Sequence, residues 1–513
     1  MDWTDGYYVG SEYTSGYYHR LGPDHLRFVC RAAGVHCRIP EAPTYLELGF
    51  GRGVSINLHA AAGEGEHWGV DFNPAHVAHA QDLADASGAR VRLFDDAFAR
   101  FAVRQDLPMF DVIVAHGVWS WISEANRQVL LQLIQDRLRP GGVAYVSYNA
   151  QPGWAGLDPV RHLMRLGSNR ILSGNAGGGG EVDRALAFVE EVVAVNPLFF
   201  ADIRPAVSHA AGLSKHSAQY LAHEYLNADW YVPYFADVAA DMAKAKLTFV
   251  SSARLLDRVN DVNLTPAGVA LLDRLKDPEL RESIRDYLVN QRFRPDVYVK
   301  GAIRMSVAEQ EAFWDSQTFV LDCVRDRIDF TVPGALGDAS LPEEVYAPLA
   351  DALAADGYKP KALPEILALA NLPALKRMDA VSALTVLVGL DVLRPARNPG
   401  PDARLRSRAY NEHVLQRAVT GPYLKHLAAP VVGGGVPCAR PDQVFLRAWW
   451  AGHRSADQLA AETWAIFQRT NERAVKNGQE MTTQADNLSV LAEMADRFLS
   501  SVVPMYRALG IVD

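Results

Sequence analysis

Short apolar runs alternate with stretches of helical periodicity in the first part of the chain. Five such runs end in glycine or polar residues, as strands do, and they cover residues 44–50, 66–72, 89–96, 109–117 and 141–149. Before the last run, the pattern predicts a helix over residues 124–138, which stops at Pro140 and Gly141. Strands that alternate with helices predict an α/β fold with a parallel, doubly wound sheet. Ligands of such sheets bind beyond the carboxyl ends of the strands, so we expect the functional residues there.

The rest of the chain carries mainly helical patterns. Residues 155–330 predict a mostly helical middle domain, and the segment TVPGALGDAS at 331–340 predicts a linker. Residues 341–400 predict two helices and a short apolar segment, an arrangement similar to a small winged-helix unit. Residues 401–513 predict a helical C-terminal domain. We expect these units to follow an α/β domain over residues 1–154.

Composition restricts the class of protein. Hydrophobic residues make up 49% and charged residues 22%, as in folded proteins, and the net charge of −9 gives no overall reason to bind nucleic acid or anionic lipid. The four cysteines have neither disulfide-framework nor metal-site spacing, which favours a reducing compartment and no metal. No apolar run reaches the ~18 residues of a membrane helix, and the N-terminus lacks a signal-peptide pattern. We therefore expect a cytoplasmic protein without a membrane span or a nucleic-acid partner.

The segment ELGFGRG at 47–53 follows the first predicted strand and opens a helix. Its spacing of one acid and three glycines leaves the backbone bare where a ligand comes close. Val54 stands where a dinucleotide loop needs its third glycine, and no Gly-Lys-Ser/Thr follows, so NAD and ATP are disfavoured. The candidate cofactor-binding residues here are Glu47, Gly49, Gly51 and Gly53.

Acidic residues end the next two predicted strands. Asp71, followed by Phe72, ends the second strand, where a carboxylate can accept both hydroxyls of a ribose. Asp96 and Ala97 follow the third strand, where an acid side chain and a backbone N–H can bind an adenine edge. Together with the glycine segment, these residues resemble the class I S-adenosylmethionine-dependent methyltransferases. The resemblance implies a Rossmann-like domain that binds S-adenosyl-L-methionine at these positions.

The segment HGVWSW at 116–121 follows the fourth predicted strand and bears on the methyl acceptor. Enzymes that methylate exocyclic base amines or glutamine amides usually carry Asn/Asp-Pro-Pro-Tyr/Phe at this place, so base methylation is disfavoured. HGVWSW together with YVSYNAQPGW at 145–154 resembles bacterial methyltransferases that carry a methyltransferase regulatory domain. This group includes the rickettsial outer-membrane-protein lysine methyltransferases.

Other motifs extend the resemblance over most of the chain. They are Tyr13-Thr14-Ser15 with Pro23, HEYL at 223–226, DYLVNQRFR at 286–294 and LAAPVVG at 427–433. The family pattern adds Tyr13 to the candidate cofactor-binding residues, and the position just past the fourth strand adds His116 and Gly117. One departure is Phe50, where many members have cysteine, and it indicates a subgroup whose acceptor can differ.

The resemblance implies methyl transfer to lysine side chains of a protein substrate. A lysine amine has a pKa of about 10.4, so it must be buried and lose its proton to a carboxylate, histidine or tyrosine, while aromatic walls hold it. The candidate catalytic residues are His116, Trp119, Tyr148, Tyr220, His223 and Glu224. Tyr220, His223 and Glu224 are predicted to lie on a helical insert that folds over the cofactor cleft.

Each of these assignments has a structural alternative. Trp119 can be a core residue, His116 can be a satisfied loop histidine, and the pair His223-Glu224 can lie on a helix surface. Two other functions also remain open: a methyltransferase for a small molecule or surface glycan, and a binding or regulatory protein that senses the cofactor and acts through its winged-helix-like region. The large size of the chain beyond the cofactor domain favours a protein substrate. A homodimer is also compatible with the sequence.

Overall fold

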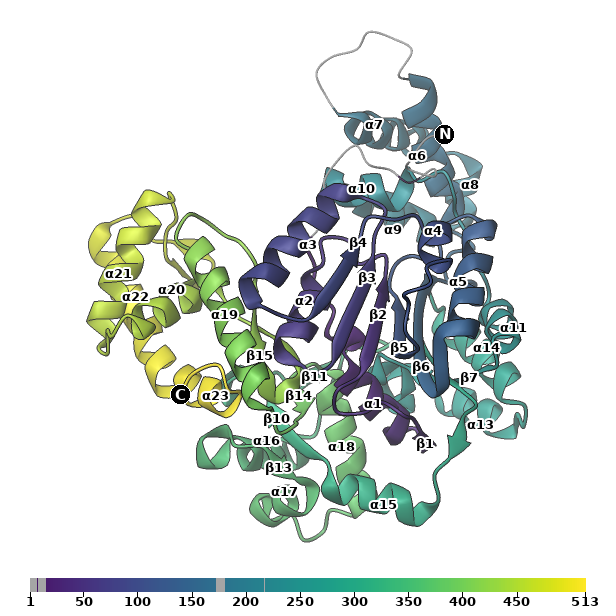
Figure 1. Ribbon diagram of the computed structural model, residues 1–513. Helices are drawn as coiled ribbons and strands as arrows, with labels where there is room; N and C mark the ends of the chain where they lie inside the picture. The colour runs from purple at the N-terminus through teal and green to yellow at the C-terminus, as the bar shows by residue number, and fades with distance from the viewer. Residues whose placement is uncertain (1–6, 8–14, 172–179, 216) are drawn as a thin grey trace.

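The computed structural model describes residues 7, 15–171, 180–215 and 217–513. Its central sheet contains β2 (Thr44–Leu48), β3 (Glu66–Val70), β4 (Val91–Phe94), β5 (Phe110–Ala115), β6 (Leu138–Asn149), β7 (Leu247–Ser252) and β8 (Phe293–Lys300). The strand order is β4-β3-β2-β5-β6-β8-β7 (Figure 1). Strands β2 to β6 are parallel, whereas β8 is antiparallel to both β6 and β7. The predicted α/β fold with a mainly parallel sheet is confirmed, and each predicted strand overlaps an observed one.

Helices cover both faces of this sheet (Figure 1). On one face lie α1 (Pro23–Ala32), α2 (Val54–Ala62) and α3 (Pro74–Ser87), and on the other lie α4 (Phe98–Ala102), α5 (Glu124–Arg137) and α11 (Phe235–Lys244). Side chains alternate along a strand, so Val112 and Val114 of β5 pack with the first group and Ile113 packs with the second. Helix α5 confirms the helix predicted before the last parallel strand.

The α/β domain extends beyond its predicted end at residue 154. Strands β7 and β8 come from the segment that the sequence assigned to the helical middle domain, and β8 pairs with β6 from Val143 to Asn149. Between these two strands lie η2 (Leu255–Arg258), α12 (Asn260–Asn263), α13 (Pro266–Arg274) and α14 (Pro278–Val289). The sheet is completed by strands that are distant in sequence, which local periodicity does not reveal.

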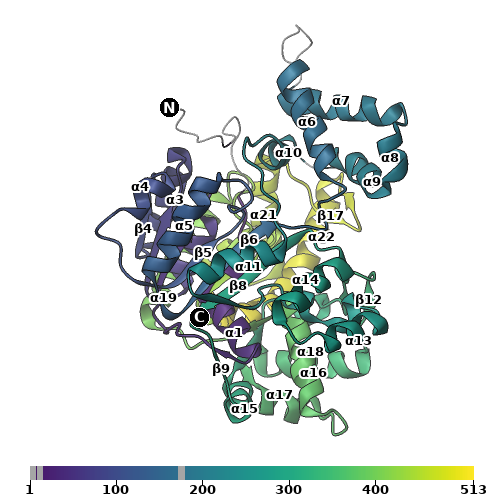
Figure 2. The ribbon, with the colours of Figure 1, turned by 90° about the vertical axis from the view of Figure 1, so that its right-hand side faces the viewer.

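A separate helical lobe is inserted between β6 and α11. It contains α6 (Asp158–Ile171), α7 (Glu181–Ala194), α8 (Leu198–Asp202), α9 (Arg204–Leu213) and α10 (Ala218–Tyr225). The lobe has its own apolar core and projects from the body of the molecule (Figure 2). Its helix α10 lies near the carboxyl end of β6, because the side chain of Asn149 donates a hydrogen bond to Glu224.

The predicted winged-helix-like unit contains more sheet than its sequence range indicates. Helices α16 (Glu343–Tyr358), α17 (Leu363–Ala370) and α18 (Arg377–Gly389) pack with the strands β10 (Thr318–Leu321), β13 (Lys361–Ala362) and β14 (Leu393–Pro395). The middle strand, β10, comes from before residue 341. The predicted linker holds a small hairpin of β11 (Thr331–Val332) and β12 (Ala339–Ser340). A further pair joins β1 (Val35–His36) to β9 (Ile303–Arg304), which precedes α15 (Val307–Ser316).

The remaining C-terminal residues are mostly helical, as predicted. They form α19 (Pro401–Arg417), α20 (Arg440–Trp450), α21 (Ala456–Arg469), α22 (Gln484–Arg497) and α23 (Val503–Ala508), with the hairpins β15 (His426–Ala429)–β16 (Gly434–Pro437) and β17 (Val475–Lys476)–β18 (Gln479–Glu480). Apolar side chains of this region share one core with Val54 and Leu58 of α2. The C-terminal region therefore packs directly against the helix that follows the glycine segment. Within the described ranges, no helix has the length and apolarity that a membrane crossing requires.

A buried ion network holds β8 to β6 and α14. Arg294 donates to Asp296 at 3.0 Å and to Glu282 at 3.3 Å, and it also pairs with Asp286. Tyr148 of β6 donates its hydroxyl to Asp296 at 2.7 Å. Burial of unpaired charge is costly, so each member of the network depends on the others.

Removal of one buried carboxylate tests this network. We expect Asp296→Ala to lower the free energy of unfolding by about 3–5 kcal/mol, because the buried Arg294 would lose one of its three carboxylate partners and the buried Tyr148 hydroxyl would lose its acceptor. As a control, Asp241→Ala breaks the ion pair of Asp241 with Lys244, whose side chain is 67% exposed, and should cost at most about 1 kcal/mol. Urea denaturation of both variants provides the comparison, and an equal loss in the two would contradict the role of the network.

Candidate active site

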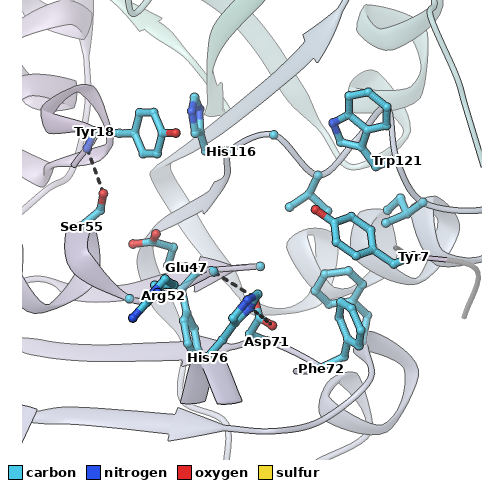
Figure 3. A pocket seen from close by; sticks show the side chains of 18 of the residues that line it. Tyr7, Tyr18, Glu47, Arg52, Ser55, Asp71, Phe72, His76, His116 and Trp121 are labelled. Carbon is cyan, nitrogen blue, oxygen red and sulfur yellow. Dashed lines mark hydrogen bonds and ion pairs between the residues drawn. The ribbon is translucent and has the colours of Figure 1, made fainter. Parts of the chain in front are cut away.

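A cavity opens at the carboxyl ends of the parallel strands (Figure 3). Figure 3 shows Tyr18 and His116 on one side of it and Tyr7 and Phe72 on the other. Every predicted cofactor-binding residue that the structure describes lines this cavity: Glu47, Gly49, Gly51, Gly53, Asp71, Phe72, Asp96, Ala97, His116 and Gly117. Tyr13 lies outside the described residues.

The glycine segment between β2 and α2 needs its glycines. Gly49, Gly51 and Gly53 have φ values of 71°, 57° and 70°, in the left-handed region that favours glycine. A Cβ atom on Gly49 would lie 2.6 Å from Val118 Cγ2, and one on Gly53 would lie 2.3 Å from Ala80 Cβ. The loop therefore keeps bare backbone toward the cavity and packs closely behind it.

Asp71 is held in place by the glycine segment and by the start of α3. Its carboxylate accepts hydrogen bonds from the backbone N–H of Gly51 at 2.8 Å and of Asn73 at 3.0 Å, and His76 Nδ1 lies 3.1 Å away. A carboxylate offers about four lone-pair positions, so it can still accept bonds from ligand hydroxyls. This arrangement fits a ribose.

The adjacent part of the cavity is apolar, with an acid at its edge. Phe72, Ala97, Phe98 and Val118 line it, which leaves a slot suited to a flat ring. Asp96 is fixed beside them by Arg100, at 3.0 Å. The combination fits an adenine, whose polar edge an acid can bind.

Glu47 is buried at the opposite side of the cavity. Tyr45 donates its hydroxyl to Glu47 Oε2 at 2.9 Å, and burial raises the pKa of the Glu47 carboxyl to about 8. A positive charge on a ligand would stabilise the ionised carboxylate. The cavity as a whole therefore fits a nucleoside ligand that carries a cationic group.

Residues 15–20, which we call the N-terminal strap, form one wall of the cavity. The Tyr18 backbone N–H donates to Ser55 Oγ at 2.9 Å, and the Tyr18 ring lies against His116, with centroids 4.1 Å apart (Figure 3). His116 Nδ1 lies 2.9 Å from the Tyr145 hydroxyl and 3.0 Å from Ser147 Oγ. Burial, with a smaller effect of Arg20, lowers the pKa of His116 to about 4, so its imidazole is neutral at pH 7.

The C-terminal region holds the strap in place. The backbone N–H of Gly435 donates to the Tyr17 hydroxyl at 2.6 Å, and a Cβ atom on Gly434 would lie 2.4 Å from that oxygen. Asp391 adds a second attachment, with His19 Nε2 at 3.1 Å and Arg20 Nη2 at 2.6 Å. Tyr17 thus occupies a notch that only glycines leave open, and the adjacent Tyr18 is directed at the cavity.

Helix α10 of the helical lobe carries three predicted catalytic residues, and one of them, His223, contacts the wall of the cavity. The ring of Tyr7, which lines the cavity, lies 5.5 Å from that of Phe72 and 5.8 Å from that of His223. Glu224 accepts a 3.3 Å hydrogen bond from Asn149, and burial raises the pKa of its carboxyl to about 7. Tyr220 is 41% exposed, one helical turn before Glu224. The insert therefore reaches the cavity through α10.

Trp119 and Tyr148 do not occupy the catalytic positions that the sequence predicted. Both are buried in the core under α5 and α11, and the Tyr148 hydroxyl donates its hydrogen bond to Asp296. Alternation along β6 directs Tyr148 away from the face that carries Ser147 and Asn149. In the turn after β5, Trp121 lines the cavity in place of Trp119.

Several residues that line the cavity were marked by no motif, among them Tyr7, Ser55 and His76. His76 could have been found from its position in the first turn of the helix that follows Asp71. Tyr7 could not, because its contact with the cavity depends on where the chain before the first helix is placed. Across the described ranges, no group of three or more His, Cys, Asp or Glu side chains is placed to hold a metal ion.

Comparisons with known proteins agree with this site. Residues 46–142 match the family described as a methyltransferase domain, and residues 217–300 match the predicted methyltransferase regulatory domain. An uncharacterized protein from Synechocystis is 32% identical over 520 residues and covers 100% of both chains. An uncharacterized protein from Rickettsia prowazekii is 25% identical over 57% of this chain and 52% of its own.

Among solved structures, PKMT2 from Rickettsia typhi matches with a TM-score of 0.69. The match covers 97% of this chain and 99% of that one at 17% identity, and a structure of the same protein in complex with AdoHcy gives the same TM-score. The structural match shows a shared fold, and the sequence matches show the family. The chain therefore belongs to the S-adenosylmethionine-dependent class I methyltransferases that carry a methyltransferase regulatory domain.

Proposed function

We propose that this methyltransferase modifies lysine side chains of a protein substrate. The observation that supports the proposal is the Glu224 carboxyl on α10, which bonds to Asn149 and has a pKa raised to about 7, while the adjacent His223 contacts Tyr7 of the cavity. A lysine amine must lose its proton before it can attack, and a carboxylate with a pKa near the working pH is an effective general base. Glu224 is therefore assigned as the proton acceptor.

The cofactor would lie along the strand ends. We assign Asp71 to its ribose hydroxyls, Asp96 and the Ala97 N–H to its adenine edge, and Phe72 to the face of the ring. When bound, S-adenosylmethionine supplies a methyl group on a positively charged sulfur. Glu47 and the His116-Gly117 turn after β5 also line the cavity, and we assign them to the part that holds the cofactor sulfur.

Aromatic side chains would surround the acceptor amine. Tyr7, Tyr18 and Trp121 line the cavity, and Tyr220 lies beside Glu224 on the lobe. Each ring can attract an ammonium by about 0.5–2 kcal/mol, and burial then favours the neutral amine. His223 is assigned to position Tyr7, whose ring it contacts. Tyr220 is partly exposed, so it can contact a protein substrate that carries the acceptor lysine.

Isotope labelling tests the acceptor class. Total protein and small molecules from a strain that lacks the gene are incubated with the enzyme and S-adenosylmethionine that carries a deuterated methyl group. We expect label in proteins, localised to lysine by mass spectrometry. Label confined to the small-molecule or glycan fraction would contradict the proposal, and binding of the cofactor without any transfer would instead support a sensor.

The pH dependence tests Glu224 as the base. Because its pKa is raised to about 7, the carboxyl is protonated below that pH, so kcat/KM should rise with pH through about 7 and then level off. In Glu224→Gln, we expect a loss of about 10²–10⁴-fold in kcat and the disappearance of this step. Glu191→Gln, an exposed position on α7 of the same lobe, provides the matched control. Retention of the step in Glu224→Gln would exclude this role.

The glycine notch predicts a link between the C-terminal region and cofactor affinity. In Gly434→Ala, the new methyl group would displace Tyr17 and thereby Tyr18, so we expect the Kd for S-adenosylhomocysteine to rise about tenfold. Tyr17→Phe keeps the ring and loses one hydrogen bond, for which we expect a rise of about 2- to 10-fold. Gly212→Ala, with nothing within 4 Å, is the matched control. Titration calorimetry measures all three Kd values. Unchanged affinity in both Gly434→Ala and Tyr17→Phe would refute the link.

A further inference from the structure

A second cavity lies behind the wall formed by Tyr18 and His116. It shares these two residues with the cofactor cavity and has a volume of about 290 Å³. Its other walls are the N-terminal strap, the start of β8, the turn after β7 and the C-terminal segments that carry Arg394 and His426. We call it the arginine cavity, because Arg20, Arg254 and Arg394 line it. No assigned role uses this space.

Positive charge dominates the lining of this cavity. Among the described residues that line it, Asp391 is the only carboxylate, and it pairs with Arg20 at 2.6 Å. Arg394 is buried and pairs at 2.7 Å with Asp322, which does not line the cavity. Arg254 has the weakest attachment, since its Nη1 lies 3.8 Å from Asp257 Oδ1 and its side chain is 41% exposed. Arg254 is therefore the guanidinium most able to bind a ligand.

The remaining polar groups are neutral and can donate or accept hydrogen bonds. Burial, with a smaller effect of Arg394, lowers the pKa of His426 to about 4. Burial also lowers the pKa of His116 to about 4. The Tyr145 hydroxyl also faces the space. Arg20 and Arg394 are each paired with a carboxylate, so Arg254 is the guanidinium that would repel a lysine ammonium, whereas a ligand carboxylate matches its planar donor geometry.

The two sides of the Tyr18–His116 wall thus differ in charge. The Glu224 carboxyl lies on α10 of the lobe, and the guanidinium groups lie on the side of the C-terminal region. We propose that the arginine cavity binds the carboxylate of an acidic residue near the acceptor lysine in the substrate protein, an inference that rests on the proposed lysine methylation. The C-terminal region would then contribute to the choice of substrate through Arg394, Asp391 and His426.

The amino-acid carboxylate of the cofactor has the same chemistry and is a second source for this ligand. The two sources differ in what they predict for Arg254. If the acceptor supplies the carboxylate, loss of Arg254 changes which lysines are methylated and leaves cofactor affinity unchanged. If the cofactor supplies it, loss of Arg254 weakens cofactor binding and leaves the sequence preference unchanged.

Site mapping with charge variants tests the proposal. Proteins of the gene-deleted strain are labelled with deuterated methyl groups by four enzymes: the wild type, Arg254→Gln, Arg254→Glu and the exposed control Arg469→Gln. Mass spectrometry then identifies the modified lysines. We expect acidic residues to be enriched near the lysines that the wild type and the control modify. Arg254→Gln should lose the enrichment, with kcat/KM on such sites lowered about tenfold. Arg254→Glu should shift the preference toward basic neighbours.

Calorimetry with S-adenosylhomocysteine completes the test. We expect its Kd in Arg254→Gln to stay within about twofold of the wild type, since the loss of one charged hydrogen bond to the cofactor would change it about tenfold. Equal acidic enrichment in wild type and Arg254→Gln, or no enrichment in either, would overturn the proposal. A tenfold weaker Kd with unchanged site preference would assign the cavity to the cofactor carboxylate. If the wild type labels no lysine while it binds S-adenosylhomocysteine, the proposed function itself fails.

Discussion

The hydrogen bond between the Gly435 amide and the Tyr17 hydroxyl joins the N-terminal strap to the C-terminal region beside the cofactor cavity. Tyr17 fits there because Gly434 and Gly435 have no side chains, and its neighbour Tyr18 is thereby placed against His116 and Ser55. A parallel sheet alone leaves the carboxyl ends of its strands open to solvent. In this protein, the strap covers them, and a region far along the chain fixes the strap. The cavity is therefore a property of the whole fold, although its central residues lie in one short segment.

Two buried carboxyl groups near this cavity differ in their surroundings and in the roles that we propose for them. Glu47 and Glu224 are both carboxyls with raised pKa values, but Glu47 is bonded to Tyr45 inside the α/β domain and Glu224 is carried by the helical lobe. A cation on the cofactor would favour ionisation of the first. A substrate amine would deliver its proton to the second. Beyond the Tyr18–His116 wall, the charge reverses, since guanidinium groups line the arginine cavity. The proposed recognition of a lysine and an acid in one substrate rests on this separation of charge.

Features that depend on local sequence could be predicted. The parallel strands and α5 follow from periodicity, and the glycine segment with Asp71 and Asp96 follows from spacing at the strand ends. Features that depend on distant segments could not. Strands β7 and β8 join the sheet only after an intervening lobe, so the α/β domain ends far later than predicted. The turn after β5 carries two tryptophans, and only the tertiary fold shows that Trp121 lines the cavity while Trp119 is buried. Tyr18, Arg254 and Arg394 come together from three regions, and no single motif connects them.

A structure with a bisubstrate ligand would show where the acceptor amine lies relative to Glu224. The ligand would be an adenosine derivative in which a lysine-like aminoalkyl chain is attached at the position of the cofactor sulfur. We expect the chain nitrogen to lie within hydrogen-bond reach, ~3 Å, of the Glu224 carboxylate, with Tyr7 and Trp121 beside it. A chain that passes the Tyr18–His116 wall into the arginine cavity, with Glu224 unoccupied by any ligand atom, would contradict the assignment of the base and the direction from which the acceptor enters.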